Sequence, residues 1–381
     1  MKKVAIIGAG ISGLFIANLF IRNKKYQVKI FERNSLINTK EGYGIQLSVN
    51  SIKLLNKIQF DKLENDEKFN PDKINFYSVK DAAKICDLDI SNFNTENCKY
   101  TTLKRSSLIN FLKKDLEKVI KFDHSISKID QQDQIIKITF RNSEIYECDY
   151  LIISDGVFSK SKNLISKNQI EPQFNNTLAI RGIIPSSSNM ADKKNISLFL
   201  GSNFHYVVYP LSPNGELNFI AVMKYKLSAD EQKDYSLFND NNFINKILEK
   251  IPNVNKEFFD NIKDLKIYPV FVSHDFFKVK NNNIHLIGDA FFAFPPSFAQ
   301  GASQSIEGAY ELFENLENNT ESSFFKNRVD KTKMVNSRSK LNLFAFHLSN
   351  PLTKFLRNIF LKRLVKNKKF LESYLGKIYR N

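Results

Sequence analysis

Cysteine and tryptophan are scarce in this chain. It has no tryptophan and only three cysteines among 381 residues. Cys86, Cys98 and Cys148 show no C-x-x-C spacing and are odd in number, which argues against a disulfide framework and a zinc site and fits a reducing compartment. The sequence has no internal repeat and no low-complexity tract. We therefore expect a globular protein without a bound metal, and 42% hydrophobic and 25% charged residues agree with that.

Acidic residues are the minority among the charged side chains. The chain has 40 Asp and Glu against 56 Lys and Arg, a formal net charge of +16. A strongly basic balance is typical of proteins that bind nucleic acid or a membrane surface. Here lysine is spread along the whole chain, and no nucleic-acid-binding motif accompanies it. We predict no nucleic-acid partner, although the positive field would favour an anionic substrate.

Charged residues are absent from residues 4–21. A membrane-spanning helix needs about 20 mostly apolar residues, and a signal peptide needs a basic start, a short apolar run and a cleavage site. Neither explains the glycine spacing in this stretch. Residues 4–7 have the continuous apolar character of a buried parallel strand, and residues 8–13 read GAGISG, which is the pattern G-x-G-x-x-G.

The glycine pattern predicts a dinucleotide-binding turn. Gly8 permits a tight turn, Gly10 lets a pyrophosphate approach the backbone, and Gly13 lets the next helix pack closely on the strand. Residues 26–31 alternate like a second strand, and Glu32 follows 19 residues after Gly13, near the roughly 20 expected for an acid that binds a ribose hydroxyl. With this assignment no targeting segment remains, and we expect a cytoplasmic protein.

Two further apolar strands end in short polar turns. Residues 149–153 lead to Ser154-Asp155-Gly156, residues 284–287 lead to Gly288-Asp289, and strand-like alternation dominates between them. We predict an α/β fold with a Rossmann-like nucleotide-binding domain, an inserted mixed or antiparallel-sheet domain and C-terminal helices. The predicted limits are 1–70, 100–172 and 274–335 for the discontinuous nucleotide-binding domain, 71–99 and 173–273 for the sheet-rich substrate domain, and 336–381 for the basic C-terminal helices.

Four motifs in this order resemble one enzyme family. They are the glycine turn with Glu32-Arg33, Arg105 opening a helix, Asp155-Gly156, and the stretch GDAFFAFPPSFAQGASQSIEGA from Gly288 onward. Over nearly its whole length the chain is similar to the single-component FAD-dependent aromatic hydroxylases, the group A flavoprotein monooxygenases. Residues 179–185, 205–210 and 339–347 resemble the branch that contains salicylate hydroxylase and 6-hydroxynicotinate 3-monooxygenase.

This resemblance implies an enzyme that hydroxylates a small phenolic or pyridinic substrate with O2, through a flavin C4a-hydroperoxide. FAD would be the cofactor, and NADPH or NADH the electron donor. Glu32 would hold the adenosine ribose, and Asp289 the ribityl or pyrophosphate region. Pro295 would stand beside the flavin ring among the catalytic residues. The implied cofactor-binding residues are Gly8, Gly10, Ile11, Ser12, Gly13, Glu32, Arg33, Arg105, Asp155, Gly156, Gly288, Asp289, Gln300, Gly301 and Ala302.

Two positions depart from the family pattern. The usual Gly-Asp-Ala-Ala-His reads Gly-Asp-Ala-Phe291-Phe292 here, which removes an imidazole expected near the flavin. The arginine that usually closes the Asp-Gly motif is Lys162, so a bidentate contact is lost. The sequence therefore does not decide between NADPH and NADH.

A base that takes a phenolic proton would assist hydroxylation, because the reaction needs an electron-rich ring. His205 and Tyr209 stand four apart on a predicted strand, so both would point to one face, and a His and a Tyr at this spacing flank the substrate in the hydroxynicotinate-type branch. The alternative is that both residues only pack in the strand. Arg181 could bind a substrate carboxylate or could pair with a nearby acid.

The C-terminal segment is strongly basic. Residues 351–381 hold nine Lys or Arg against one acid, Glu372, a net charge of +8. We expect Phe355, Ile359, Leu361, Leu364 and Val365 to share one face of a helix. Such a helix either packs on the nucleotide-binding domain or makes peripheral contact with an anionic membrane.

Other functions remain open at this point. One is a membrane-associated hydroxylase of a prenylated phenol, as in the ubiquinone pathway, and another is an FAD-binding protein that does not activate oxygen. Flavin-dependent halogenation is disfavoured, because its Trp-bearing motif is missing from a chain without tryptophan. The assembly could be a monomer or a homodimer.

Overall fold

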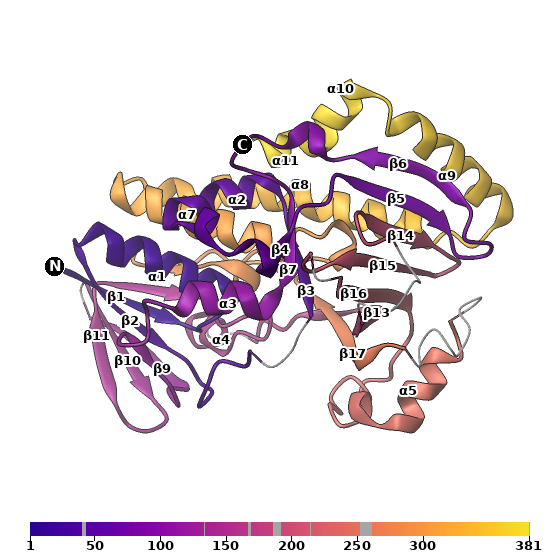
Figure 1. Cartoon of the computed structure of the whole chain (residues 1–381). Helices are drawn as coiled ribbons and strands as arrows, with labels where there is room; N and C mark the ends of the chain where they lie inside the picture. The colour runs from indigo at the N-terminus through magenta and orange to yellow at the C-terminus, as the bar shows by residue number, and fades with distance from the viewer. Residues whose placement is uncertain are drawn as a thin grey trace.

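The computed structural model describes residues 1–39, 43–132, 134–166, 169–185, 192–213, 215–251 and 261–380. Two sheet-based parts lie side by side, and a long helix, α8, passes behind both of them (Figure 1). The C-terminal helices return over the outer end of the second part. The mixed α/β fold predicted from the sequence is confirmed.

A parallel sheet of five strands forms the first part. Its order is β18-β12-β1-β2-β8, and every neighbouring pair is parallel. The central strand, β1, is buried on both faces. Residues Val4 to Ile6 of this strand are all apolar and have no exposed surface, as expected for a strand of a parallel sheet that is covered on both sides. The strands are β1 (Lys2–Ile7), β2 (Tyr26–Phe31), β8 (Ile120–Lys121), β12 (Tyr150–Ile153) and β18 (Ile284–Leu286).

Helices cover one face of this sheet and a second, small sheet covers the other. Val4 and Ile6 point into the helix-side core, whereas Ala5 and Ile7 point into the core under the small sheet, as the two-residue period of a strand requires. The helices are α1 (Ile11–Asn23), α2 (Val49–Leu55), α3 (Arg105–Lys113) and α7 (Gly301–Glu317), and the small antiparallel sheet contains β9 (Ile126–Gln132), β10 (Ile135–Phe140) and β11 (Ile145–Cys148). Helix α4 (Lys160–Ser166) lies on the small-sheet side, where it packs against β9.

The second part is built on a sheet of seven strands in the order β17-β13-β16-β15-β14-β5-β6. All neighbours are antiparallel except β14 and β5. Helix α5 (Asn241–Leu248) packs on one face through Phe243 and Ile247. The strands are β5 (Lys73–Ser78), β6 (Lys84–Asp89), β13 (Gln173–Ile184), β14 (Ile196–Leu200), β15 (Phe204–Pro210), β16 (Leu217–Lys224) and β17 (Lys263–Val272).

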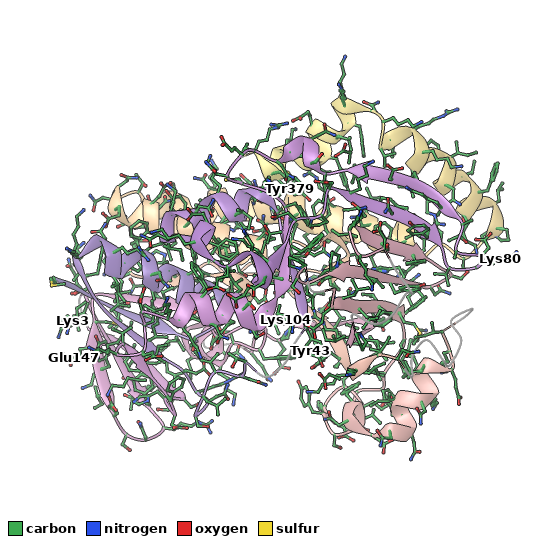
Figure 2. All side chains as sticks on the ribbon, viewed as in Figure 1. Lys3, Tyr43, Lys80, Lys104, Glu147 and Tyr379 are labelled. Carbon is green, nitrogen blue, oxygen red and sulfur yellow. The ribbon has the colours of Figure 1, made fainter. Side chains whose placement is uncertain are left out.

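Short strands join the two parts. They are β3 (Gly44–Leu47), β4 (Lys68–Phe69) and β7 (Thr101–Lys104). The Gly44 amide donates to Asn218 Oδ1 (2.6 Å), the Tyr43 hydroxyl donates to the Asp264 carbonyl (3.1 Å), and Lys104 pairs with Glu216. Figure 2 shows Tyr43 and Lys104 at this junction. These contacts fix the walls of the cavity that lies between the parts.

The C-terminal helices close the far side of that cavity. They are α8 (Glu321–Phe346), α9 (Pro351–Leu364), α10 (Lys368–Leu371) and α11 (Lys377–Tyr379), with a π-helical turn at Glu372–Gly376. Helix α8 runs without a break across residue 336, and the domain limits given above stay a prediction. In the described parts of the chain, no helix is both long and apolar enough to cross a membrane. The 3-10 turns are Asn56–Ile58, Phe60–Lys62, Asn65–Glu67, Ser91–Phe93, Leu237–Asn239, Gly288–Ala290 and Pro296–Phe298.

Candidate active site

The glycine turn after β1 combines two packed glycines with an open one. Gly8 has φ +99°, and a Cβ there would lie 2.6 Å from the Ser154 carbonyl oxygen. A Cβ on Gly13 would lie 2.1 Å from the Gly8 carbonyl oxygen. A Cβ on Gly10 would meet nothing within 4 Å. The turn is therefore packed where α1 crosses the strand and open at the N-terminus of α1, where a phosphate can approach.

Three polar turns meet at the carboxyl edge of the parallel sheet. The Ser154 hydroxyl donates to the Ile7 carbonyl (2.8 Å), which ties the turn after β12 to the glycine turn. A Cβ on Gly288 would lie 2.5 Å from Ser12 Oγ, so the turn after β18 also touches the start of α1. This follows from the strand order, in which β1, β12 and β18 are neighbours. The sequence motifs around residues 8, 155 and 289 thus form one continuous edge.

Glu32 lies on the other side of the same turn. The Ala9 amide donates to Glu32 Oε2 (2.9 Å), and the Asn34 amide donates to Oε1 (3.0 Å). The carboxylate is therefore held beside the glycine turn at the end of β2. Arg33 follows it and is exposed. Ile11 and Ser12 begin α1, with Ser12 buried against Gly288.

Asp289 and Arg105 approach each other although 184 positions separate them in the sequence. Asp289 lines the cavity between the two parts. The surrounding protein raises the pKa of Asp289 to about 6 by removing water from the carboxyl group, and the positive charge of Arg105 opposes the shift. Arg105 begins α3, and its amide donates to the Tyr43 carbonyl (2.8 Å).

One cavity of about 770 Å³ joins the nucleotide-binding edge to the seven-stranded sheet. On the first side it is lined by Asp289, Pro295, Gly301 and Ala302, and a Cβ on Gly301 would meet nothing within 4 Å. On the sheet side it is lined by Arg181, His205 and Tyr209. The prediction that His205 and Tyr209 share a face is confirmed, because both line this cavity from β15.

Tyr209 belongs to a polar group in an otherwise apolar wall. The Tyr100 hydroxyl donates to Gln46 Oε1 (2.8 Å), and the Gln46 side chain also hydrogen-bonds Tyr209. Burial raises the pKa of Tyr209 well above its usual range, while the charge of Arg181 and the bond to Gln46 oppose the shift. Tyr209 is therefore a neutral hydrogen-bonding group at ordinary pH.

His205 is paired with a second histidine that comes from the end of α8. His205 Nδ1 and His347 Nε2 lie 2.7 Å apart, and the two rings are 3% and 1% exposed. Burial lowers the pKa of His205 well below its usual range and that of His347 to about 3, and the neighbouring imidazole lowers the pKa of His205 further. Both rings are therefore neutral near pH 7, as a general base must be. The resemblance of residues 339–347 was the only sequence signal for His347.

This pair predicts a loss of stability in mild acid. Below the unfolded pKa of about 6.5, the unfolded chain binds protons that the buried rings refuse, so the free energy of unfolding should fall by about 1.4 kcal/mol per pH unit for each histidine. The raised pKa values of Asp289 (about 6) and Glu311 act in the opposite direction, whereas burial lowers the pKa of His285 to about 4 and so adds to the loss. Thermal unfolding of the holoprotein at pH 8, 6.5 and 5 measures the decline.

The double variant H205Q/H347Q supplies the comparison for the acid effect, because its amides do not titrate. Its midpoint should fall less steeply than that of the wild type between pH 6.5 and 5. H274Q is the control, because His274 is exposed. Equal slopes for the wild type and H205Q/H347Q would contradict the assignment of buried neutral rings.

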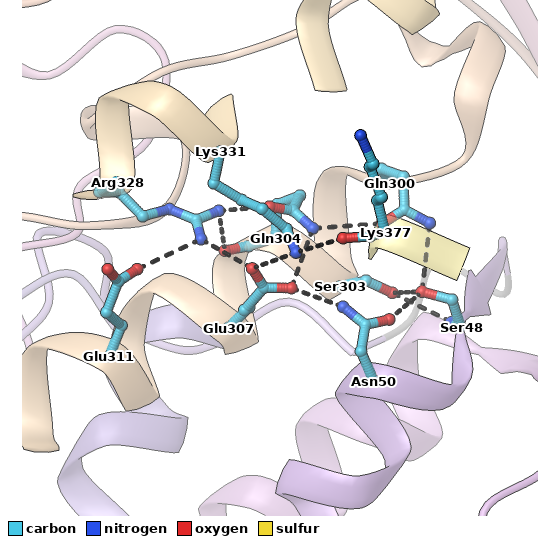
Figure 3. A network of polar contacts seen from close by, with 10 residues as sticks. All are labelled: Ser48, Asn50, Gln300, Ser303, Gln304, Glu307, Glu311, Arg328, Lys331 and Lys377. Carbon is cyan, nitrogen blue, oxygen red and sulfur yellow. Dashed lines mark hydrogen bonds and ion pairs between the residues drawn. The ribbon is translucent and has the colours of Figure 1, made fainter. Parts of the chain in front are cut away.

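A polar network behind the cavity holds the N-terminus of α7 (Figure 3). The Gln300 side chain donates to Ser48 Oγ (3.1 Å), and Gln300 does not line the cavity, whereas its neighbours Ala299 and Gly301 do. Arg328 lies 3.2 Å from Glu307 Oε1 and 3.6 Å from Glu311 Oε2, and it donates to Gln304 Oε1 (2.5 Å). Sequence reasoning missed this network, because charged residues on helices are usually solvated.

Replacing Arg328 should destabilise the protein strongly. Its side chain is 4% exposed, and Arg328→Met leaves Glu311 without its cation and Glu307 with only Lys331 (3.4 Å). We expect the free energy of unfolding to fall by about 3 kcal/mol, measured by urea unfolding of the holoprotein. Lys25→Met is the matched control, because the Lys25–Glu317 pair is exposed on the lysine side (69%) and should contribute at most about 1 kcal/mol. Equal losses in the two variants would contradict this interpretation.

The departures from the family pattern lie outside the cavity. Phe291 and Phe292 are 6% and 2% exposed and belong to the core beneath the small sheet, where Phe292 stacks on Phe276 with 4.5 Å between ring centroids. Lys162 is buried, and its ammonium donates to the Ala290 carbonyl (3.4 Å). These residues shape the turn that carries Asp289 from behind rather than lining the site.

The Asp155 side chain stabilises the turn in which it lies. Its Oδ2 accepts from the Ser161 hydroxyl (2.8 Å) and amide (3.2 Å) at the start of α4. Gly156 has φ +87°, and a Cβ there would meet nothing within 4 Å. Asp155 therefore holds the turn in shape, and Gly156 is its open position.

The comparisons with known proteins agree with this geometry. A family model described as an FAD binding domain matches residues 1–322. The chain belongs to this FAD-binding family. Its cofactor is accordingly FAD, and its reaction class is that of the flavin-dependent monooxygenases. The predicted family, fold class, cofactor and reaction class are confirmed.

The relatives of this FAD-binding chain share little sequence identity with it, but they align over most of its length. The 6-hydroxynicotinate 3-monooxygenase of Bordetella bronchiseptica is 20% identical, and the alignment covers 96% of this chain and 98% of that protein. A salicylate hydroxylase of Pseudomonas putida is 23% identical over 81% of this chain and 75% of its own length. The structure of Klebsiella pneumoniae HpxO with FAD and uric acid superposes with a TM-score of 0.80 at 13% identity, and covers 98% of this chain and 97% of its own.

The residues of this chain fit FAD. Open space faces Gly10 at one end of the edge and Gly301 at the other, and a side chain at either position would project into it. The N-termini of α1 and α7 both point at this space with their free amides, which suits a pyrophosphate at one end and a ring that gains negative charge at the other.

Proposed function

We propose that the protein hydroxylates a small phenolic or pyridinic acid with O2 and NADPH or NADH. The reaction consumes the ring, O2, the reduced nucleotide and a proton, and it yields the hydroxylated ring, water and the oxidised nucleotide. Bound FAD supplies the redox chemistry that passes the two electrons to oxygen. The observation that carries the proposal is the shared cavity: His205, Tyr209 and Arg181 line the same space as Pro295 and Gly301.

We assign the cofactor-binding roles along the sheet edge. Residues 8–13 with Glu32 and Arg33 hold the adenosine half, Arg105, Asp155, Gly156, Gly288 and Asp289 follow the middle, and Gln300, Gly301 and Ala302 with Pro295 frame the ring. The support is their position on one continuous edge. Gln300 acts through its backbone, because its side chain bonds Ser48.

The chain's own residues orient and deprotonate the substrate. His205 is neutral, lines the cavity and is held by His347, so it can accept a phenolic proton at its cavity-facing nitrogen. Tyr209 and Gln46 offer hydrogen bonds to a ring substituent. Arg181 places a cation where a substrate carboxylate can bind, and the apolar walls exclude water from the ring.

A substrate screen tests this function directly. Purified holoprotein is mixed with hydroxybenzoates and hydroxypyridine carboxylates, and NADH or NADPH oxidation is followed together with formation of the hydroxylated product. We expect at least one acid to stimulate both, and Arg181→Met to raise its KM with a smaller effect on kcat. Nucleotide oxidation that yields only hydrogen peroxide with every acid would contradict the hydroxylase assignment.

One alternative is favoured by a specific observation. A hydroxylase of phenols with long apolar chains is supported by the many apolar side chains that the C-terminal helices add to the cavity. Phe291 and Phe292, the departures from the family pattern, lie outside the cavity and therefore give no support to an FAD protein without oxygen chemistry. Whether the protein is a monomer or a homodimer stays a prediction.

A further inference from the structure

We propose that the chain docks on an anionic membrane surface through its α8–α9 face, and that the cavity also binds aromatic rings that carry an apolar chain. The α8–α9 face consists of Leu341 and Phe344 on α8 and Leu352, Phe355, Leu356 and Phe360 on α9. This inference rests on the proposed function only in taking the cavity as the site of the aromatic ring.

The α8–α9 face is exposed to an unusual degree. Its six side chains are between 43% and 66% exposed, and they make up six of the thirteen exposed large hydrophobic residues in the described parts of the chain. The four on α9 follow the spacing i, i+3, i+4 and i+8, which places them on one side of the helix. A contiguous apolar patch of this kind marks a binding surface rather than ordinary exposure.

Helix α9 already uses its other side for packing. Leu361 and Val365 lie against the core formed with the seven-stranded sheet, and Arg357 is 7% exposed and donates to the Ala345 carbonyl (3.3 Å). The expectation that Phe355 shares a face with Leu361 and Val365 is therefore wrong: Phe355 is 61% exposed. The outward stripe of α9 is apolar without being needed for the fold.

Charge around the face selects the partner. Residues 351–381 carry nine basic side chains and one acidic one, Glu372, which is paired with Arg380 (2.9 Å). Lys362, Arg363, Lys366 and the Lys368–Lys369 pair are exposed. Two copies of this chain would bring like charges together, whereas anionic lipid headgroups complement them. An apolar stripe with basic flanks is the pattern of a helix that lies in the membrane interface.

The cavity opens at the same face. Leu341, Phe344, Leu356 and Phe360 are both exposed and part of the cavity lining. Behind them the lining continues through Leu364, Phe370 and Leu371, which are apolar. A ligand whose ring reaches His205 can therefore leave an apolar chain along this wall, and it can enter from the lipid without crossing water.

Vesicle flotation tests the docking surface. FAD-loaded protein should float with vesicles of equal parts phosphatidylcholine and phosphatidylglycerol, should bind at least about tenfold less to phosphatidylcholine alone, and should be released by high salt. The variant L352E/F355E should lower binding to the anionic vesicles by at least about tenfold. Neither residue lines the cavity, so its FAD content and its rate with soluble acids should equal those of the wild type.

The matched control is I135E/I145E, which changes two exposed hydrophobic residues on the small sheet and should float like the wild type. Wild-type protein that stays at the bottom of the gradient, or L352E/F355E that floats normally, overturns the proposal. A dimer that becomes a monomer in L352E/F355E, measured by light scattering, also overturns it and assigns the face to a second copy. Flotation does not depend on turnover. A failure of the proposed hydroxylation would therefore leave this test of the docking surface unaffected.

Ligand affinity tests the second half of the proposal. Changes in the flavin absorption spectrum report binding of phenol and of 4-octylphenol to the wild-type holoprotein. We expect octylphenol to bind at least about a hundredfold more tightly, and Leu364→Trp to reduce that ratio at least about tenfold by filling the apolar wall. Equal affinities for the two phenols, or an unchanged ratio in Leu364→Trp, would rule out a chain-bearing ligand.

Discussion

The variant Gly10→Val should purify as a folded, colourless protein. Gly10 has φ −83°, which valine adopts readily, and a Cβ there meets nothing within 4 Å, so the apoprotein has no reason to change. The added side chain fills the space that the FAD pyrophosphate needs beside the N-terminus of α1. We expect FAD affinity to fall at least about a hundredfold, or roughly 2.7 kcal/mol, measured by flavin fluorescence quenching, with an unchanged circular dichroism spectrum.

Gly13→Val is the matched comparison within the same motif. Its Cβ would lie 2.1 Å from the Gly8 carbonyl oxygen, so this variant should lose its fold rather than only its cofactor. The two glycines are three residues apart and differ only in whether protein or open space faces them. A yellow Gly10→Val protein with wild-type FAD affinity would show that the cofactor lies elsewhere.

Replacing His205 should remove most of the hydroxylation rate while FAD stays bound. His205→Gln keeps a hydrogen-bonding group next to His347 but has no basic nitrogen for the cavity. We expect kcat to fall about a hundredfold or more, since a positioned base typically contributes about 10²–10⁴-fold. The measurement is product formation with the best acid from the screen, across pH 6 to 10.

The pH profile separates a lost base from a lost fold. Solution pH can ionise a phenol before it binds, so H205Q should regain rate as the pH approaches the phenol's own pKa, whereas the wild type should stay nearly flat. Tyr206→Phe is the control, because Tyr206 belongs to the core on the opposite face of β15. A uniform loss at every pH, with the same loss in Tyr206→Phe, would assign His205 a structural role only.

The sheet edge could be predicted from the sequence because its signals are local. A strand that is buried on both faces must be apolar throughout, as residues 4–7 and 150–153 are, and glycine is required where φ is positive, as at Gly8. That His205 and Tyr209 lie on the same face of β15 likewise follows from the two-residue period of a strand. These inferences need no knowledge of distant neighbours.

The missed features depend on contacts between distant segments. His347 reaches His205 across 142 positions, and Arg328 reaches α7 from the next helix. Nothing local distinguishes Arg328 from a solvated arginine. The buried side of helix α9 was predicted wrongly for another reason. The helix is apolar on two sides, and the residues that decide which side is buried lie in other parts of the chain.

A titration of apoprotein with FAD, followed in the same sample by soluble hydroxybenzoates, tests the central claim that cofactor and substrate share the cavity between the two parts. We predict binding of one FAD per chain with quenching of its fluorescence, and then a saturable change in the flavin spectrum that Arg181→Met weakens. FAD that does not bind, or a flavin spectrum indifferent to every aromatic ligand, would contradict the account.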